Sequence, residues 1–107
     1  MNPQEFWSQV LAALDGTGLE LQTIKGLWFR AVKKGSSIKV DNAIQHKPSC
    51  RMTTPRTITE KDVVDLLPLY HSLISGRKGI RQKAREQSQN ASYVFPIIGR
   101  FYHLLEG

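Results

Sequence analysis

The sequence has one cysteine, Cys50, and no long apolar run. A single cysteine excludes an intrachain disulfide and is typical of a reducing compartment. No stretch approaches the ~18 apolar residues of a membrane-spanning helix. The first residues also lack the basic segment and the apolar run of a signal peptide. The sequence therefore predicts a cytoplasmic protein without a membrane partner.

The chain also lacks the motifs of common cofactor and metal sites. It contains no Gly-rich loop of the dinucleotide-binding or P-loop type. The histidines His46, His71 and His103 are far apart, and only His46 has a cysteine nearby, whereas structural zinc commonly needs four such ligands. No catalytic motif surrounds Cys50. The sequence predicts no cofactor and no metal, and it does not favour an enzyme.

The first half of the chain predicts a helix followed by strands. The length of 107 residues and the hydrophobic content of 40% fit one globular domain over 1–107. Asn2 is a suitable N-cap, and apolar residues at helical spacing continue to Gly16. Residues 19–40 alternate in polarity around a turn at Gly35, which is typical of an antiparallel meander of two or three strands.

The second half predicts a loop and two further helices. Residues 41–56 contain two prolines and many Ser and Thr, which indicates a loop with room for a short edge strand around Met52. Thr59, followed by acidic residues, indicates a helix start. This helix should continue to Gly76, and Pro68 should kink or split it.

The C-terminal part predicts a basic segment before the last helix. Residues 77–89 are either an exposed basic helix or a loop. The last helix should begin near Asn90 or Ser92, with Pro96 within about its first turn. The expected fold is therefore an α+β domain: an N-terminal helix, an antiparallel meander, and two helices packed on the sheet with the basic segment between them.

The charge of the chain is strongly segregated. The formal net charge is +6, and it comes from two blocks. Residues 25–56 contain eight Lys and Arg against one acid, and residues 77–85 contain five and no acid. Residues 1–24 contain three acids and no basic residue, and residues 57–76 contain three acids against one Lys. We expect the two basic blocks to form one positive face.

A positive face of this kind predicts nucleic-acid binding, with DNA favoured over RNA. Phosphates need several Lys or Arg heads together with small polar groups or amides that fix the register. The hairpin around Gly35 and the segment 77–90 both offer them, and Gln87 and Gln89 are further candidates for base contacts. The predicted nucleic-acid-binding residues are Arg30, Lys33, Lys34, Lys39, Arg77, Lys78, Arg81, Lys83, Arg85, Gln89, Asn90 and Ser92.

Two other function classes remain open. The first is a protein-interaction module or a homodimer, because aromatic residues are enriched at interfaces and this chain has many large rings for a small core, including Trp28 and Phe29. The second is a small metal-dependent nuclease, because Asp62 and Asp65 are spaced to share one helix face. Capping of the helix start would also explain these two acids.

Overall fold

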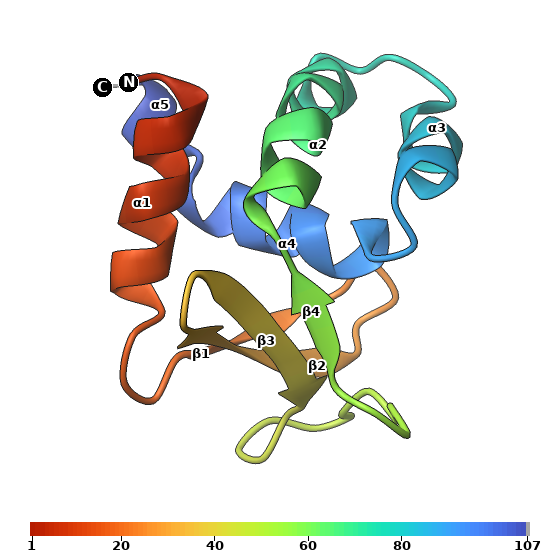
Figure 1. Cartoon of the computed structure of the whole chain (residues 1–107). Coiled ribbons are helices and arrows are strands. Elements are labelled where there is room, and N and C mark those ends of the chain that lie inside the picture. Colours follow the sequence, from red (N-terminus) through yellow and green to blue (C-terminus); the bar gives the residue numbers. More distant parts are fainter. Residues whose placement is uncertain (107) are drawn as a thin grey trace.

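The computed structural model describes residues 1–106, in which five helices accompany one four-stranded antiparallel sheet (Figure 1). The α+β class predicted from the sequence is confirmed. The elements follow one another as α1 (Pro3–Ala13), β1 (Leu19–Gln22), β2 (Trp28–Lys34), β3 (Ser37–Asn42), β4 (Arg56–Ile58), α2 (Glu60–Ile74), α3 (Ile80–Gln87), α4 (Ala91–Phe101) and α5 (His103–Glu106).

The sheet is a meander of four strands in the order β1-β2-β3-β4. The sequence predicted two or three strands, with the edge strand around Met52, whereas β4 begins at Arg56. Met52 does not join the ladder because the side chain of Asn42 binds both its amide and its carbonyl, at 2.7 and 3.0 Å. The expected edge strand therefore forms four residues later, directly after Pro55.

The helices cover one face of the sheet, and α4 lies between the sheet and the other helices (Figure 1). Six residues of α4 are buried, and they include Val94, Ile97 and Ile98. Phe29 and Val40 meet them from the sheet, and both are fully buried. The core therefore forms between α4 and the sheet. This packing fixes the position in space of the start of α4.

The helix starts follow the local sequence. Asn2 caps α1, where its side chain accepts a hydrogen bond from the Glu5 amide at 2.8 Å. Thr59 and Asp62 form a reciprocal capping box at the start of α2. The segment that the sequence left open between helix and loop is helical over Ile80–Gln87, because Ile80 and Ala84 occupy one buried face.

Both internal prolines are tolerated inside helices. Of the two outcomes expected at Pro68, a kink or a split, the split does not occur, because α2 runs without a break over Glu60–Ile74. A proline removes one backbone hydrogen bond, and the fully buried Val63 and Leu66 pack this helix into the core. Pro96 is the sixth residue of α4, beyond the first turn where it was expected. Within residues 1–106, no helix is both long enough and apolar enough to span a membrane.

Candidate nucleic-acid interface

Helix α3 presents two arginines on one face. Arg81 and Arg85 are four residues apart, so they lie one turn apart on the same side of the helix. The guanidinium carbon of Arg81 lies 5.8 Å from the centroid of the Phe95 ring in α4. This contact orients Arg81 toward α4, while Ile80 and Ala84 hold the adjacent side of α3 in the core.

The turn between β1 and β2 brings a third cation to the same place. Thr23 and Leu27 are hydrogen-bonded to each other across the turn. The Thr23 amide donates to the Leu27 carbonyl at 2.9 Å. The Leu27 amide donates in return to the Thr23 hydroxyl at 3.2 Å. Gly26 supplies the positive φ of 88° that this turn requires. Lys25 lies at the tip, between the exposed side chains of Ile24 and Leu27.

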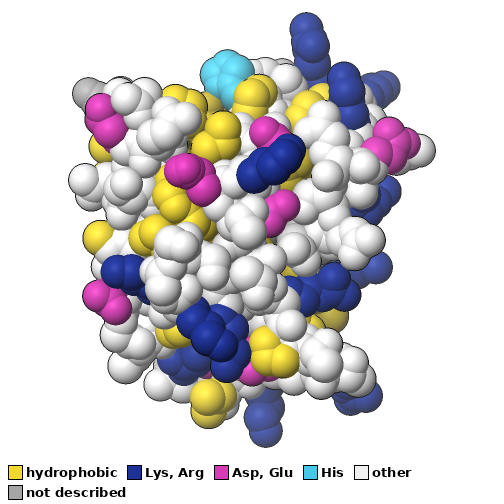
Figure 2. All heavy atoms as spheres, in the orientation of Figure 1, with side chains coloured by type: hydrophobic (Ala, Val, Ile, Leu, Met, Phe, Trp, Pro, Cys, Tyr) yellow, Lys and Arg dark blue, Asp and Glu magenta, His cyan; other side chains and the backbone are white. Residues whose placement is uncertain are grey.

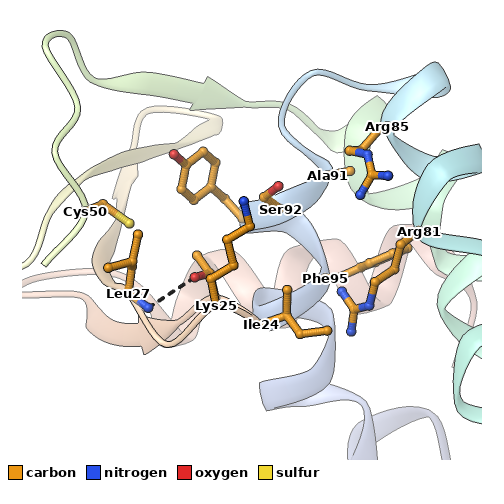
Figure 3. Close-up of a pocket in the computed structure, with 11 residues that line it drawn as sticks. Ile24, Lys25, Leu27, Cys50, Arg81, Arg85, Ala91, Ser92 and Phe95 are labelled. Carbon is orange, nitrogen blue, oxygen red and sulfur yellow. Dashed lines mark hydrogen bonds between the residues drawn. The ribbon is translucent and has the colours of Figure 1, made fainter. Parts of the chain in front are cut away.

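These segments surround a pocket of about 510 Å³, which we call the basic pocket (Figure 3). This volume lies within the roughly 300–1,000 Å³ of typical ligand pockets. Figure 3 shows Arg81 and Arg85 on one side, Cys50 and Leu27 on the other, and Lys25 extending from the turn toward Ser92. The basic pocket is lined by Thr23, Ile24, Lys25, Leu27, Cys50, Arg81, Arg85, Ala91, Ser92, Tyr93 and Phe95.

The basic pocket is electrostatically positive. None of its lining residues is an Asp or a Glu. In the part of the chain that the structure describes, Lys25, Arg81 and Arg85 form no ion pair. Ala91 and Ser92 are the first residues of α4, and the Ala91 amide already donates to the Ser88 carbonyl at 3.3 Å. The arrangement therefore offers an anion three unpaired cations and the positive end of a helix dipole.

A second hollow extends this surface. It is lined by Lys47, Arg51 and neighbouring residues, and it shares Leu27 and Cys50 with the basic pocket. Cys50 is only 6% exposed, and burial raises the pKa of its thiol. Figure 2 shows Lys and Arg side chains along the edge of the molecule near α3 and around the lower end of the sheet, while acidic side chains lie over α2.

The basic hairpin predicted from the sequence lies elsewhere. Lys33 and Lys34 are at the far end of β2 from Leu27, and seven residues of strand span about 20 Å. The Lys33 amide donates to the Leu14 carbonyl at 2.9 Å, which places the hairpin tip beside the end of α1. The structure therefore separates the hairpin part of the first basic block from the second block, whereas Lys25 of the first block lines the same pocket as Arg81 and Arg85.

Other predicted site residues already have partners within the protein. The Arg30 guanidinium donates to Glu20 at 2.9 Å and to the Thr17 carbonyl. Lys39 lies 3.9 Å from Asp41. Asn90 donates to the Thr57 carbonyl at 3.1 Å, so its side chain connects the start of α4 to β4.

The remaining candidates are near the basic pocket in sequence but do not line it. Arg77 and Lys78 are exposed in the turn before α3, and Lys83 is exposed on the outer side of that helix. Gln89 is exposed in the turn between α3 and α4. Of the twelve predicted residues, the basic pocket contains Arg81, Arg85 and Ser92.

Sequence reasoning missed several residues of the basic pocket, above all Lys25. The pattern of a Lys and a Gly between two strands indicates a turn whose Lys is exposed. Nothing local indicates that this turn meets α3. Tyr93 and Phe95 were not among the predicted nucleic-acid-binding residues, although both line the basic pocket.

The features behind the two alternative functions have roles inside the protein. Asp62 caps α2 and accepts a hydrogen bond from Ser88 at 3.2 Å, and Asp65 pairs with Lys61. Among residues 1–106 no cluster of three His, Cys, Asp or Glu side chains is placed to hold a metal ion. Phe29 is fully buried, and Trp28 stacks on the His46 ring with centroids 4.0 Å apart.

Comparison with protein-family models, with curated proteins and with solved structures finds no match to this chain. The function is therefore inferred from the chemistry of the site.

Proposed function

We propose that this protein binds nucleic acid through the basic pocket and the exposed cations around it. The observation that carries the proposal is the convergence of Lys25, Arg81 and Arg85, from two separate parts of the chain, on one pocket without an acidic residue. Such a group of unpaired cations matches the phosphates of a polyanion, where each contact releases a condensed counterion.

The proposal differs from the sequence prediction in its geometry. The segment 77–90 remains part of the interface, with Arg77, Lys78 and Lys83 as outer phosphate contacts near the basic pocket. The proposal omits the hairpin residues Lys33 and Lys34, because they lie at the far end of β2 from the basic pocket. We keep DNA as the first polymer to test, and a cytoplasmic location in keeping with the single free cysteine.

The test compares two double variants that remove the same charge. R81Q/R85Q removes two cations from the basic pocket, and K33Q/K34Q removes two from the hairpin tip. Binding of a fluorescein-labelled DNA oligonucleotide is followed by anisotropy at ~50 mM salt, and circular dichroism confirms that each variant is folded. We expect R81Q/R85Q to weaken binding about tenfold or more, and K33Q/K34Q to leave it within about twofold.

Two outcomes would contradict the proposal. Equal weakening by both variants would show that net charge, and not the basic pocket, governs binding. No detectable binding of DNA or RNA by the wild-type protein at ~50 mM salt would remove nucleic acid as the ligand.

A further inference from the structure

We infer that the basic pocket receives one unpaired nucleotide of a single strand, with the base inside the pocket and its phosphate on the arginines. This inference rests on the proposed function and adds the form of nucleic acid that the site recognises. It follows from the shape of the site, from the division of its lining and from the exposure of two aliphatic side chains.

The shape of the site does not suit a duplex. In a duplex the bases are paired and stacked, so a protein reaches mainly phosphates and groove edges. A pocket of about 510 Å³ against a duplex backbone would stay unfilled. In a single strand the bases are free to turn outward and to stack on or pack against a protein surface.

The lining of the basic pocket is divided between charge and apolar surface. Arg81 and Arg85 come from α3 on one side, and Leu27 and Cys50 lie on the other (Figure 3). Tyr93, near the start of α4, also lines the basic pocket. A nucleotide has the same division, because its phosphate is anionic and the faces of its base are apolar.

Two aliphatic side chains at the basic pocket are exposed without a partner in the protein. Ile24 is 66% exposed and Leu27 is 36% exposed, although both belong to a tight, hydrogen-bonded turn. A ligand with an apolar face would remove these two side chains from water, and burial of apolar surface is favourable. A base packed on Ile24 and Leu27 would bury them while its phosphate reaches Arg81 or Arg85.

Polar groups for orienting a base are also present. The Ser92 side chain is exposed at the edge of the basic pocket, and its hydroxyl can donate and accept hydrogen bonds. The Thr23 hydroxyl accepts from the Leu27 amide and keeps its own proton to donate. These two groups can bind the edge of a base without being specific for one base.

The experiment compares four ligands by anisotropy or by sedimentation. They are a labelled single-stranded DNA, the corresponding duplex, a single strand of the same length with abasic sites, and vesicles of anionic phospholipid. The abasic strand keeps the phosphates and removes the bases. We expect the intact single strand to bind about tenfold more tightly than the duplex or the abasic strand, and the vesicles not to bind.

The matched variants replace exposed aliphatic residues inside and outside the basic pocket. I24S/L27S removes the apolar wall, and I74S changes an exposed isoleucine at the end of α2. We expect I24S/L27S to bind single strand and duplex equally, with duplex affinity unchanged, and I74S to behave as wild type. If I24S/L27S does not fold, the amide NMR shifts of Ile24 and Leu27 in the wild type must change more with the intact strand than with the abasic one, both at saturation.

The outcomes separate this inference from the proposed function. Equal binding of intact and abasic strands would overturn the base site but leave phosphate binding in place. A preference for single strands that survives in I24S/L27S would place the base elsewhere and would also overturn it. Binding to vesicles alone would overturn both, and it would make the Ile24–Leu27 turn a membrane contact.

Discussion

The carboxylate of Glu20 lies 2.9 Å from the guanidinium of Arg30, across the neighbouring strands β1 and β2. The amides of Ile44, Gln45 and His46 also donate to this carboxylate, at 2.7 to 3.1 Å. The Glu20 side chain is only 2% exposed. One acidic residue therefore neutralises a cation of the basic block and holds the loop between β3 and β4 against the sheet.

The first prediction concerns the stability that Glu20 provides. Burial alone would raise the pKa of Glu20, but hydrogen bonds from the three loop amides and from the His46 side chain lower it well below its ordinary value of 4.5. A carboxylate whose pKa is lowered on folding stabilises the protein above its unfolded pKa and loses this contribution as the pH falls. We expect Glu20→Gln to lower the free energy of unfolding by about 2 kcal/mol at neutral pH.

Urea unfolding, followed by tryptophan fluorescence from pH 7 to pH 3, measures this effect. The difference between wild type and Glu20→Gln should be constant above about pH 5 and should shrink below the ordinary pKa of 4.5. A difference that stays the same down to pH 3 would show that the charge of Glu20 is not what stabilises the loop.

The features that were predicted from the sequence depend on neighbours along the chain. Asn2 and Thr59 cap their helices through residues three positions away, so the pattern alone indicated both starts. Ile80 and Ala84 were the only core candidates in residues 77–89, and the sequence left this segment open between an exposed helix and a loop. The capping interactions are local, and the tertiary structure left them unchanged.

The basic pocket could not be predicted in this way. Lys25 meets Arg81 only because α3 packs on α2 and α4 and so faces the turn between β1 and β2. Segregated charge predicted a positive surface, but it did not indicate which cations of the two blocks remained unpaired. Arg30 is an example. Its partner Glu20 alternates with apolar residues, as an exposed strand residue does, so the sequence did not indicate that the two side chains form an ion pair.

The second prediction concerns the loop between α1 and β1, which lies in close contact with β2. Gly18 has a φ of +71°, and a Cβ there would lie 2.2 Å from the Ala31 carbonyl oxygen and 2.3 Å from Cγ2 of Val32. We expect Gly18→Ala to lower the free energy of unfolding by about 3 kcal/mol, from backbone strain and overpacking together.

Gly16 is the matched control for this substitution. It also has a positive φ, of +82°, but a Cβ there would have no atom within 4 Å. Gly16→Ala should therefore lower the free energy of unfolding by only about 1 kcal/mol, because alanine is strained in the left-handed backbone conformation. Equal losses in the two variants, measured by urea unfolding, would show that the approach to Val32 does not restrict residue 18.

The third prediction separates two neighbouring residues that the sequence assigned to base contacts. The Asn90 side chain donates to the Thr57 carbonyl at 3.1 Å, whereas Gln89 is exposed. We expect Asn90→Ala to lower the free energy of unfolding by about 1 kcal/mol, and Gln89→Ala to change it by less than about 0.5 kcal/mol. Thermal and urea unfolding of both variants measure these values, and a loss with Gln89→Ala as large as that with Asn90→Ala would contradict the assignment.

The fourth prediction concerns the salt dependence of binding, because it counts phosphate contacts. For a single strand, the logarithm of the binding constant falls with the logarithm of the salt concentration by about 0.7 for each neutralised phosphate. If Arg81 and Arg85 each contact a phosphate, R81Q/R85Q should reduce the magnitude of this slope by about 1.4. K33Q/K34Q should leave the slope unchanged, although it removes the same formal charge.

Anisotropy titrations between ~50 and ~300 mM salt measure the slopes of the wild type and of both variants. If R81Q/R85Q weakens binding without changing the slope, then these arginines do not contact phosphate. They would instead support the Phe95 side of the basic pocket.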